Sequence, residues 1–315
     1  MNNLMISLEV IFPLATWMAL GYLLRSALGL NENWVKTTTA FAFRVLMPLL
    51  LFRNMVESDF AIVFSGEMAR LIAFILAAYG AMYTLAMVLT PRLVKEPSRK
   101  GVIVQGIVRA NTAIFGIPIA MSLFGDGNIG IVGLMVGMMV PVFNISCVIA
   151  LEVFRGGKPK WKHILSNVAK NPLIIGITTG ILWNVLRIPM PNMLRDAIWK
   201  LSACTSPLSF FVLGAGFTFA GAVANKKALT VVTILRLVII PGIWIGLGAL
   251  VGFRGLELLC IMIIFAPPTA ITSYSMACAM GGDPELSNGI VVFTSTLSVV
   301  TVFGWVWLLK SSALI

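Results

Sequence analysis

Three arginines lie well inside apolar stretches of the sequence, where little water would reach them. They are Arg44, Arg109 and Arg236. At ~1.5 Å of rise per helical residue, each would lie roughly 12 to 15 Å along its helix, close to the midplane of a bilayer. A cation at that depth is costly unless it is paired, so each arginine is a candidate for binding an anion. Arg44 could instead extend towards the lipid headgroups.

Carboxylates are missing from the same depth. Glu9, Glu152 and Glu257 come nearest, and all three lie close to the ends of apolar stretches. The excess of deep positive charge predicts an anionic ligand. Without a deep carboxylate there is no obvious proton relay, which leaves a coupling proton, a coupling sodium ion and uniport open. No other cofactor is expected.

Enzymatic and metal chemistry are not indicated. The four cysteines lie within apolar stretches without CxxC spacing, and the single histidine, His163, lies in a basic segment. These spacings do not form a metal site. There is also no pairing of a nucleophile with a base at membrane depth. The residues therefore favour a binding site over an active site.

Two apolar stretches are interrupted near their middles. The first, Arg109 to Gly127, contains Gly116 and Pro118, and the second contains Pro267 and Pro268. Proline lacks a backbone donor and clashes with the preceding turn, so both helices are expected to unwind there. Unwound backbone is tolerated in a membrane only where it is buried in protein or lines a cavity. Simple kinks without a binding role are the alternative.

Polar residues surround both interruptions, which favours a binding site over simple kinks. The ends of broken helices carry unpaired N–H groups and partial positive charge, and these attract anions. Besides Arg109 and Arg236, the candidate substrate-binding residues near the breaks are Asn111, Thr112, Thr269, Thr272 and Ser273.

The composition requires a membrane around these residues. Hydrophobic residues make up 59% of the 315 residues and charged residues 11%, whereas soluble domains contain about 25% charged residues. The N-terminal apolar stretch lacks the features of a signal peptide. We expect an all-α polytopic membrane protein with ten transmembrane helices near residues 5–24, 34–54, 67–90, 101–124, 129–154, 167–187, 197–222, 228–252, 255–280 and 286–310.

The distribution of lysine and arginine predicts the orientation. The loops after helices 1, 3, 5, 7 and 9 hold most of these residues, and such loops usually face the cytoplasm. Both termini would then lie outside the cell, in a multi-pass protein of the cell inner (plasma) membrane. The net charge of +11 follows from these loops, so nucleic acid is not an expected partner.

Several short patterns recur about half a chain apart. Pro13-Leu14 and Pro48-Leu49 return 159 residues later as Pro172-Leu173 and Pro207-Leu208, and Thr112-Ala113-Ile114 returns 157 residues later as Thr269-Ala270-Ile271. We therefore predict a first repeat over residues 1–155, a cytoplasmic linker over 156–166 and a second repeat over 167–315. Five helices per repeat would make the second repeat inverted, as in many secondary transporters.

The motifs at these positions resemble the auxin efflux carrier family, which includes bacterial malonate and malate permeases. The matching segments are MPLLLF (Met47 to Phe52), NTAIFGIP (Asn111 to Pro118), APPTAI (Ala266 to Ile271) and GDPELSNG (Gly282 to Gly289). They occur in the family's order, and the similarity covers essentially the whole chain.

The resemblance implies a fold like that of the bile-acid sodium symporters, also NhaA-like, in which broken helices 4 and 9 cross. It implies a scaffold part of helices 1, 2, 6 and 7, a transport part of helices 3–5 and 8–10, and a homodimer through the scaffold helices. The substrate would lie between the two breaks, which adds Asn144 of the fifth helix to the candidate site.

These observations together predict a secondary transporter with elevator-type alternating access for a small organic anion, a mono- or dicarboxylate such as malate or malonate. Two departures from the plant exporters argue against auxin itself: the segment Asn171 to Ile175 reads NPLII, and the central loop is short. The alternative is a channel-like or uniport efflux carrier for an aromatic, auxin-like weak acid.

Overall fold

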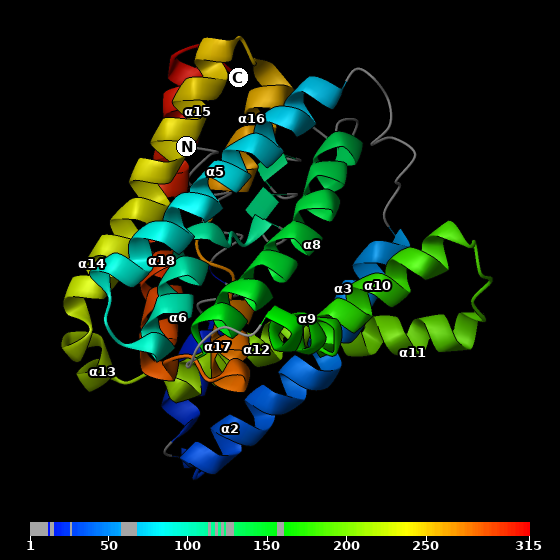
Figure 1. Cartoon of the computed structure of the whole chain (residues 1–315), viewed down its shortest axis with the longest axis vertical. Coiled ribbons are helices and arrows are strands. Elements are labelled where there is room, and N and C mark those ends of the chain that lie inside the picture. Colours follow the sequence, from blue (N-terminus) through cyan, green and yellow to red (C-terminus); the bar gives the residue numbers. More distant parts are fainter. Residues whose placement is uncertain are drawn as a thin grey trace.

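The computed structural model describes residues 12, 16–25, 27–57, 68–112, 115–116, 119–120, 123, 129–155 and 161–315. Within these residues, regular structure consists of helices and one isolated β-bridge. Figure 1 shows the helices gathered in a bundle, with α2 at one end and α15 and α16 at the other.

The first half of the chain contributes helices on either side of the first interruption. They are α2 (Glu32–Phe41), the π-helical turn η1 (Ala42–Leu46), α3 (Met47–Glu57), α5 (Ala69–Leu93), α6 (Pro97–Val108) and α8 (Ile129–Phe154).

The second half begins with the linker helix and contains the second interruption. Its helices are α9 (Trp161–Ala169), α10 (Pro172–Val185), α11 (Asn192–Ala203), α12 (Thr205–Gly216), α13 (Phe219–Ala224), α14 (Lys226–Ile234), the π-helical turn η4 (Leu235–Ile239), α15 (Ile240–Val251), α16 (Gly255–Phe265), α17 (Thr272–Met280) and α18 (Pro284–Ser311).

Six helices in the described residues are long and apolar enough to cross a membrane, and two shorter apolar helices, α10 and α16, accompany them. The helices therefore fit the predicted polytopic membrane protein. The long spans are Glu32–Glu57, Ala69–Leu93, Ile131–Phe154, Asn192–Gly216, Lys226–Val251 and Pro284–Ser311. The count of ten helices stays a prediction, and half of the first predicted helix, residues 5–11 and 13–15, lies outside the described residues.

Two spanning helices contain a π-helical turn, and each turn ends two residues before a proline. η1 precedes Pro48, and η4 precedes Pro241. Proline removes one backbone hydrogen bond and pushes against the carbonyl one turn earlier, and a wider turn accommodates this conflict. Each turn also carries one of the deep arginines. Arg44 lies on an exposed face, whereas Arg236 is wholly buried.

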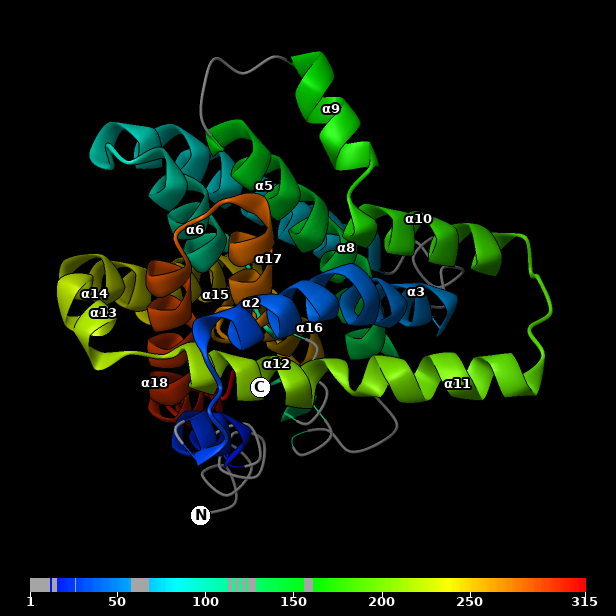
Figure 2. The ribbon, with the colours of Figure 1, turned by 90° about the horizontal axis from the view of Figure 1, so that it is seen from below.

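Helices α10 and α11 both pack against α3, and α12 packs against α2 and η1 (Figure 2). Glycines allow the closest approaches in this group. A Cβ atom on Gly180 of α10 would lie 2.7 Å from the carbonyl oxygen of Phe52 in α3. Gly21, 159 residues before Gly180, approaches the carbonyl oxygen of Phe211, 159 residues after Phe52. The same glycine-to-carbonyl contact thus occurs twice. In one copy the glycine comes from the second half of the chain, and in the other it comes from the first half.

Alanine at Gly180 is expected to destabilise the protein. Its methyl group would lie 2.7 Å from both the Phe52 carbonyl oxygen and the Cβ of Met55, and overpacking of this kind costs about 1–3 kcal/mol. The midpoint of thermal unfolding in detergent should therefore fall. Gly246→Ala is the matched control, because a methyl group there would meet nothing within 4 Å. Equal midpoints for the two variants would contradict the close packing of α3 and α10.

Candidate functional site

The two interrupted helices meet in extended backbone. The helix α6 ends just before Arg109, whose backbone is extended with φ −95° and ψ 102°. The second interruption separates α16 from α17. Between the two breaks, Ala110 and Thr269 form an isolated antiparallel β-bridge.

This bridge satisfies backbone groups that the breaks release. The Asn111 N–H donates to the Pro268 carbonyl over 2.8 Å, and the Ala270 N–H donates to the Arg109 carbonyl over 3.0 Å. Pro267 and Pro268 offer carbonyl acceptors but no N–H donors, so they cannot continue α16. Backbone groups have no water to bond with inside a membrane, so pairing between the breaks stabilises both of them.

The described backbone is already broken at Arg109 and Ala110, before Gly116. Gly116 is helical, and a Cβ atom there would lie 2.5 Å from the Cγ2 of Ile263 in α16. This glycine therefore permits close packing and does not mark the unwound segment. Pro118 lies outside the described residues. The helix ends instead before Arg109, because the backbone that follows pairs with the other break.

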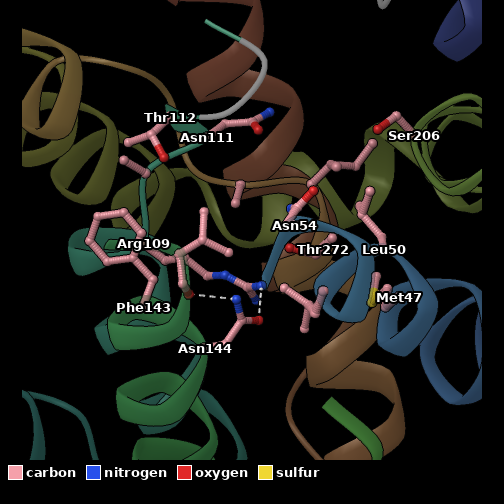
Figure 3. A pocket seen from close by; sticks show the side chains of 15 residues that line it. Met47, Leu50, Asn54, Arg109, Asn111, Thr112, Phe143, Asn144, Ser206 and Thr272 are labelled. Carbon is pink, nitrogen blue, oxygen red and sulfur yellow. Dashed lines mark hydrogen bonds between the residues drawn. The ribbon is translucent and has the colours of Figure 1, made fainter. Parts of the chain in front are cut away.

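A cavity of about 90 Å³ lies beside the crossing (Figure 3). A single water needs roughly 10 to 15 Å³ of such space, so the cavity suits a few waters or a small organic molecule. The crossing and α8 form part of its wall, and α3 and α12 form the rest. The polar side chains in the wall are those of Asn54, Arg109, Asn111, Thr112, Asn144, Ser206 and Thr272.

Among the described residues, the hydrogen-bond partners of Arg109 are neutral. Its side chain is buried, Nη2 donates to Oδ1 of Asn144 over 2.7 Å, and Nη1 donates to the sulfur of Met276. Asn144 is held in place because its Nδ2 donates to the Val140 carbonyl over 2.7 Å (Figure 3). No ion pair in the described part of the chain involves Arg109. Its charge is therefore buried without a described counter-charge, which is unfavourable until an anion arrives.

Further donors border the same cavity. Asn111 Nδ2 and Thr112 Oγ1 are buried, and neither has a hydrogen-bond partner among the described residues. Thr272, the first residue of α17, also forms part of the wall, and a helix N-terminus carries partial positive charge. A guanidinium, an amide, a hydroxyl and a helix N-terminus together favour a carboxylate ligand.

Three of the predicted binding residues lie outside the cavity wall. Thr269 is wholly buried and donates through Oγ1 to a backbone carbonyl of α6 over 2.7 Å. Ser273 is buried in α17, and Arg236 bonds to backbone carbonyls behind the crossing. Sequence depth placed these residues near the breaks, but it does not fix the direction of a side chain.

The wall also contains residues that the sequence did not single out. Met47, Leu50 and Asn54 of α3 follow one another at intervals of three and four, and Ser206 comes from α12. This spacing places the α3 residues on one helix face. This spacing could have indicated a helix face that lines the cavity. A mostly apolar face of a membrane helix can equally well contact lipid, however, so the spacing alone does not decide between the two.

Comparison with known sequences identifies the family of the chain. The profile of a family described as membrane transport protein matches residues 6–168 and 160–306. The chain belongs to this membrane transport protein family, that of the auxin efflux carriers.

Two sequence relatives span nearly the same length as this chain. An uncharacterized transporter of Methanocaldococcus jannaschii is 24% identical over 97% of this chain and 99% of its own. An uncharacterized transporter of Methanothermobacter thermautotrophicus is 21% identical over 95% of this chain and 97% of its own.

In this membrane transport protein, Asn144→Asp tests the unbalanced charge of Arg109. An aspartate of nearly the same shape would place a carboxylate on the guanidinium. A carboxylate ligand should then bind about tenfold more weakly or worse, because the counter-charge is already present. The midpoint of thermal unfolding without ligand should hold or rise. Both quantities can be measured by ligand-induced thermal shift of the purified protein with a panel of carboxylates.

Asn144→Ala is the control for this experiment. It removes the amide that orients Arg109 without adding charge, so it should retain more carboxylate binding than Asn144→Asp. Undiminished binding in Asn144→Asp would show that the charge of Arg109 does not recognise the ligand.

Proposed function

We propose that this chain is a secondary transporter of a small organic anion and that Arg109 binds the carboxylate. One observation carries the proposal: a buried guanidinium borders a small cavity and has no carboxylate partner among the described residues. An entering carboxylate would supply the missing negative charge and accept hydrogen bonds from the guanidinium. Compact mono- or dicarboxylates such as malate or malonate suit the cavity's size.

The position of the cavity supports alternating access of the elevator type. Its wall joins the crossing and α8 to α3 and α12. We propose that α2, α3, α10, α11 and α12 belong to a scaffold, which their mutual packing supports. The crossing, together with α5, α6, α8 and α14 to α18, would be the part that moves. Sliding of one group along the other would open the cavity first to one side of the membrane and then to the other.

Reciprocal contacts support the proposed inverted repeats, residues 1–155 and 167–315, with the linker 156–166 between them. Thr205 Oγ1 donates to the Leu46 carbonyl over 3.1 Å, across 159 residues. The Asn111–Pro268 hydrogen bond joins residues 157 apart. Direct contact between equivalent positions is expected where a pseudo-twofold axis passes through the protein. Ten helices, external termini, the plasma membrane and a homodimer through the scaffold belong to the same proposal.

An aromatic, auxin-like weak acid is the second candidate substrate. The apolar part of the cavity wall, which includes Leu50, Phe143 and Ile271, favours a ligand with an apolar body and one carboxylate. Competition between such an acid and a dicarboxylate for binding would separate the two substrate classes.

Counterflow in proteoliposomes tests the transport proposal. Vesicles loaded with an unlabelled carboxylate should accelerate uptake of the same labelled carboxylate, which a channel would not do. Arg109→Gln should lower this exchange about tenfold or more, because the charge-assisted bonds to the substrate are lost. Arg44→Gln should exchange like the unmodified protein, since Arg44 lies on an exposed face. Flux without acceleration would favour the channel alternative.

Cross-linking tests the relative movement of the two groups. Ser206 of α12 and Thr272 of α17 both line the cavity. In a background without the four native cysteines, Ser206→Cys with Thr272→Cys should lose counterflow when a short, reducible bifunctional thiol reagent joins them. Reduction should restore it, and neither single variant should respond. Full exchange by the cross-linked protein would count against an elevator movement.

A further inference from the structure

Arg236 joins the two broken helices from behind the crossing. Its side chain is wholly buried, and it does not line the cavity. Nε donates to the Pro267 carbonyl over 2.9 Å, and Nη1 donates to the Ile107 carbonyl over 3.1 Å. Ile107 lies in the last turn of α6, and Pro267 follows the last turn of α16. One guanidinium therefore bridges the C-terminal ends of two half-helices.

Those two helix ends carry negative partial charge. The last carbonyls of a helix lack partners within it, and together they act as about half a negative elementary charge. Two such ends meet at Arg236, so their partial charges together are close to the single positive charge of the guanidinium. Arg236 forms no ion pair among the described residues. Its counter-charge is thus the two helix ends.

We propose that Arg236 is a built-in cation that takes the place of a coupling sodium ion at the crossing. In transporters with broken helices, unwound carbonyls and half-helix C-termini commonly coordinate sodium ions. Here the same type of carbonyl already accepts hydrogen bonds from a guanidinium, which stays charged at every physiological pH. A cation attached to the chain cannot be released to either side. The carrier therefore works without sodium coupling.

The arrangement divides the charge at the crossing between two arginines. Arg236 balances the C-terminal ends of α6 and α16, whereas Arg109 and the N-terminal end of α17 face the cavity. The inference rests on the proposed function only for its consequence in transport. The claim that Arg236 neutralises the two helix ends concerns its hydrogen bonds to Pro267 and Ile107, which form without substrate.

Thermal unfolding of the purified protein tests that claim. The unmodified protein should show the same midpoint in sodium chloride and in choline chloride. Arg236→Ala should unfold at a lower temperature, because the two helix ends lose their counter-charge. Methylguanidinium at low millimolar concentration should restore part of the loss by binding between the two carbonyls. Arg44→Ala, which changes an arginine in the equivalent kind of π-helical turn, should show neither the loss nor the recovery.

If Arg236→Ala does not fold, a comparison of a charged with an uncharged replacement of Arg236 still tests the proposal. Arg236→Lys keeps the charge, and Arg236→Gln keeps a donor without charge. The lysine variant should retain a higher unfolding midpoint and about tenfold more carboxylate counterflow than the glutamine variant. Equal behaviour of lysine and glutamine would show that Arg236 acts through packing alone and would overturn the proposal.

Sodium dependence provides the second decisive result. Counterflow by the unmodified protein that stops in choline chloride would overturn the proposal, because a separate sodium ion would then be required. Absence of any carboxylate counterflow, in either salt, would instead count against the proposed function. The substrate-free unfolding experiment would still decide the role of Arg236.

Discussion

The structure depends on one constraint, which is that backbone groups freed inside a membrane must find partners within the protein. The second break contains Pro267 and Pro268, which provide carbonyl oxygens and no N–H groups. A second proline pair in the first break could not bond to them. The first break has ordinary residues at the equivalent positions, Ala110 and Asn111, and the Asn111 N–H donates to the Pro268 carbonyl. Complementary sequences, not identical ones, hold the crossing together.

The same constraint accounts for the two buried arginines. Where two half-helices end against each other, their C-terminal carbonyls point into protein, and Arg236 supplies the donors and the charge that those carbonyls need. On the other side of the crossing, the hydrogen-bond partners of Arg109 among the described residues are an amide and a thioether. Two of the three Arg236 nitrogens are therefore bonded to backbone carbonyls of the crossing, whereas Arg109 is the cation proposed to bind a ligand.

Much of this organisation was predictable from the sequence because apolar length and proline position depend on local chemistry. The exact place of the first break was harder to predict. The rule that proline breaks helices drew attention to Pro118, whereas the repeat offset of 157 residues aligns Pro267 and Pro268 with Ala110 and Asn111. The offset pointed to the correct segment, because pairing between the breaks determines where the helix ends.

The directions of side chains were not predictable in the same way. Arg44 and Arg236 occupy similar apolar surroundings in the sequence, and both lie in π-helical turns before a proline. One is exposed and the other is buried because different helices pack around them, which no local pattern records. The contribution of α3 and α12 to the cavity has the same cause. Their residues reach the site only through contacts between the two packed groups of helices.

The twofold pattern of the chain therefore does not lead to a symmetric site. A proline has no polar side chain, so the second break offers a ligand only backbone groups and, at the N-terminal end of α17, the Thr272 side chain. The first break keeps Arg109, Asn111 and Thr112, whose side chains all border the cavity. Prolines in one repeat fix the acceptors of the crossing, and their absence from the other repeat frees its side chains for recognition. In the proposed site, recognition of the anion would therefore depend mainly on the first break, because of the way the two breaks satisfy each other.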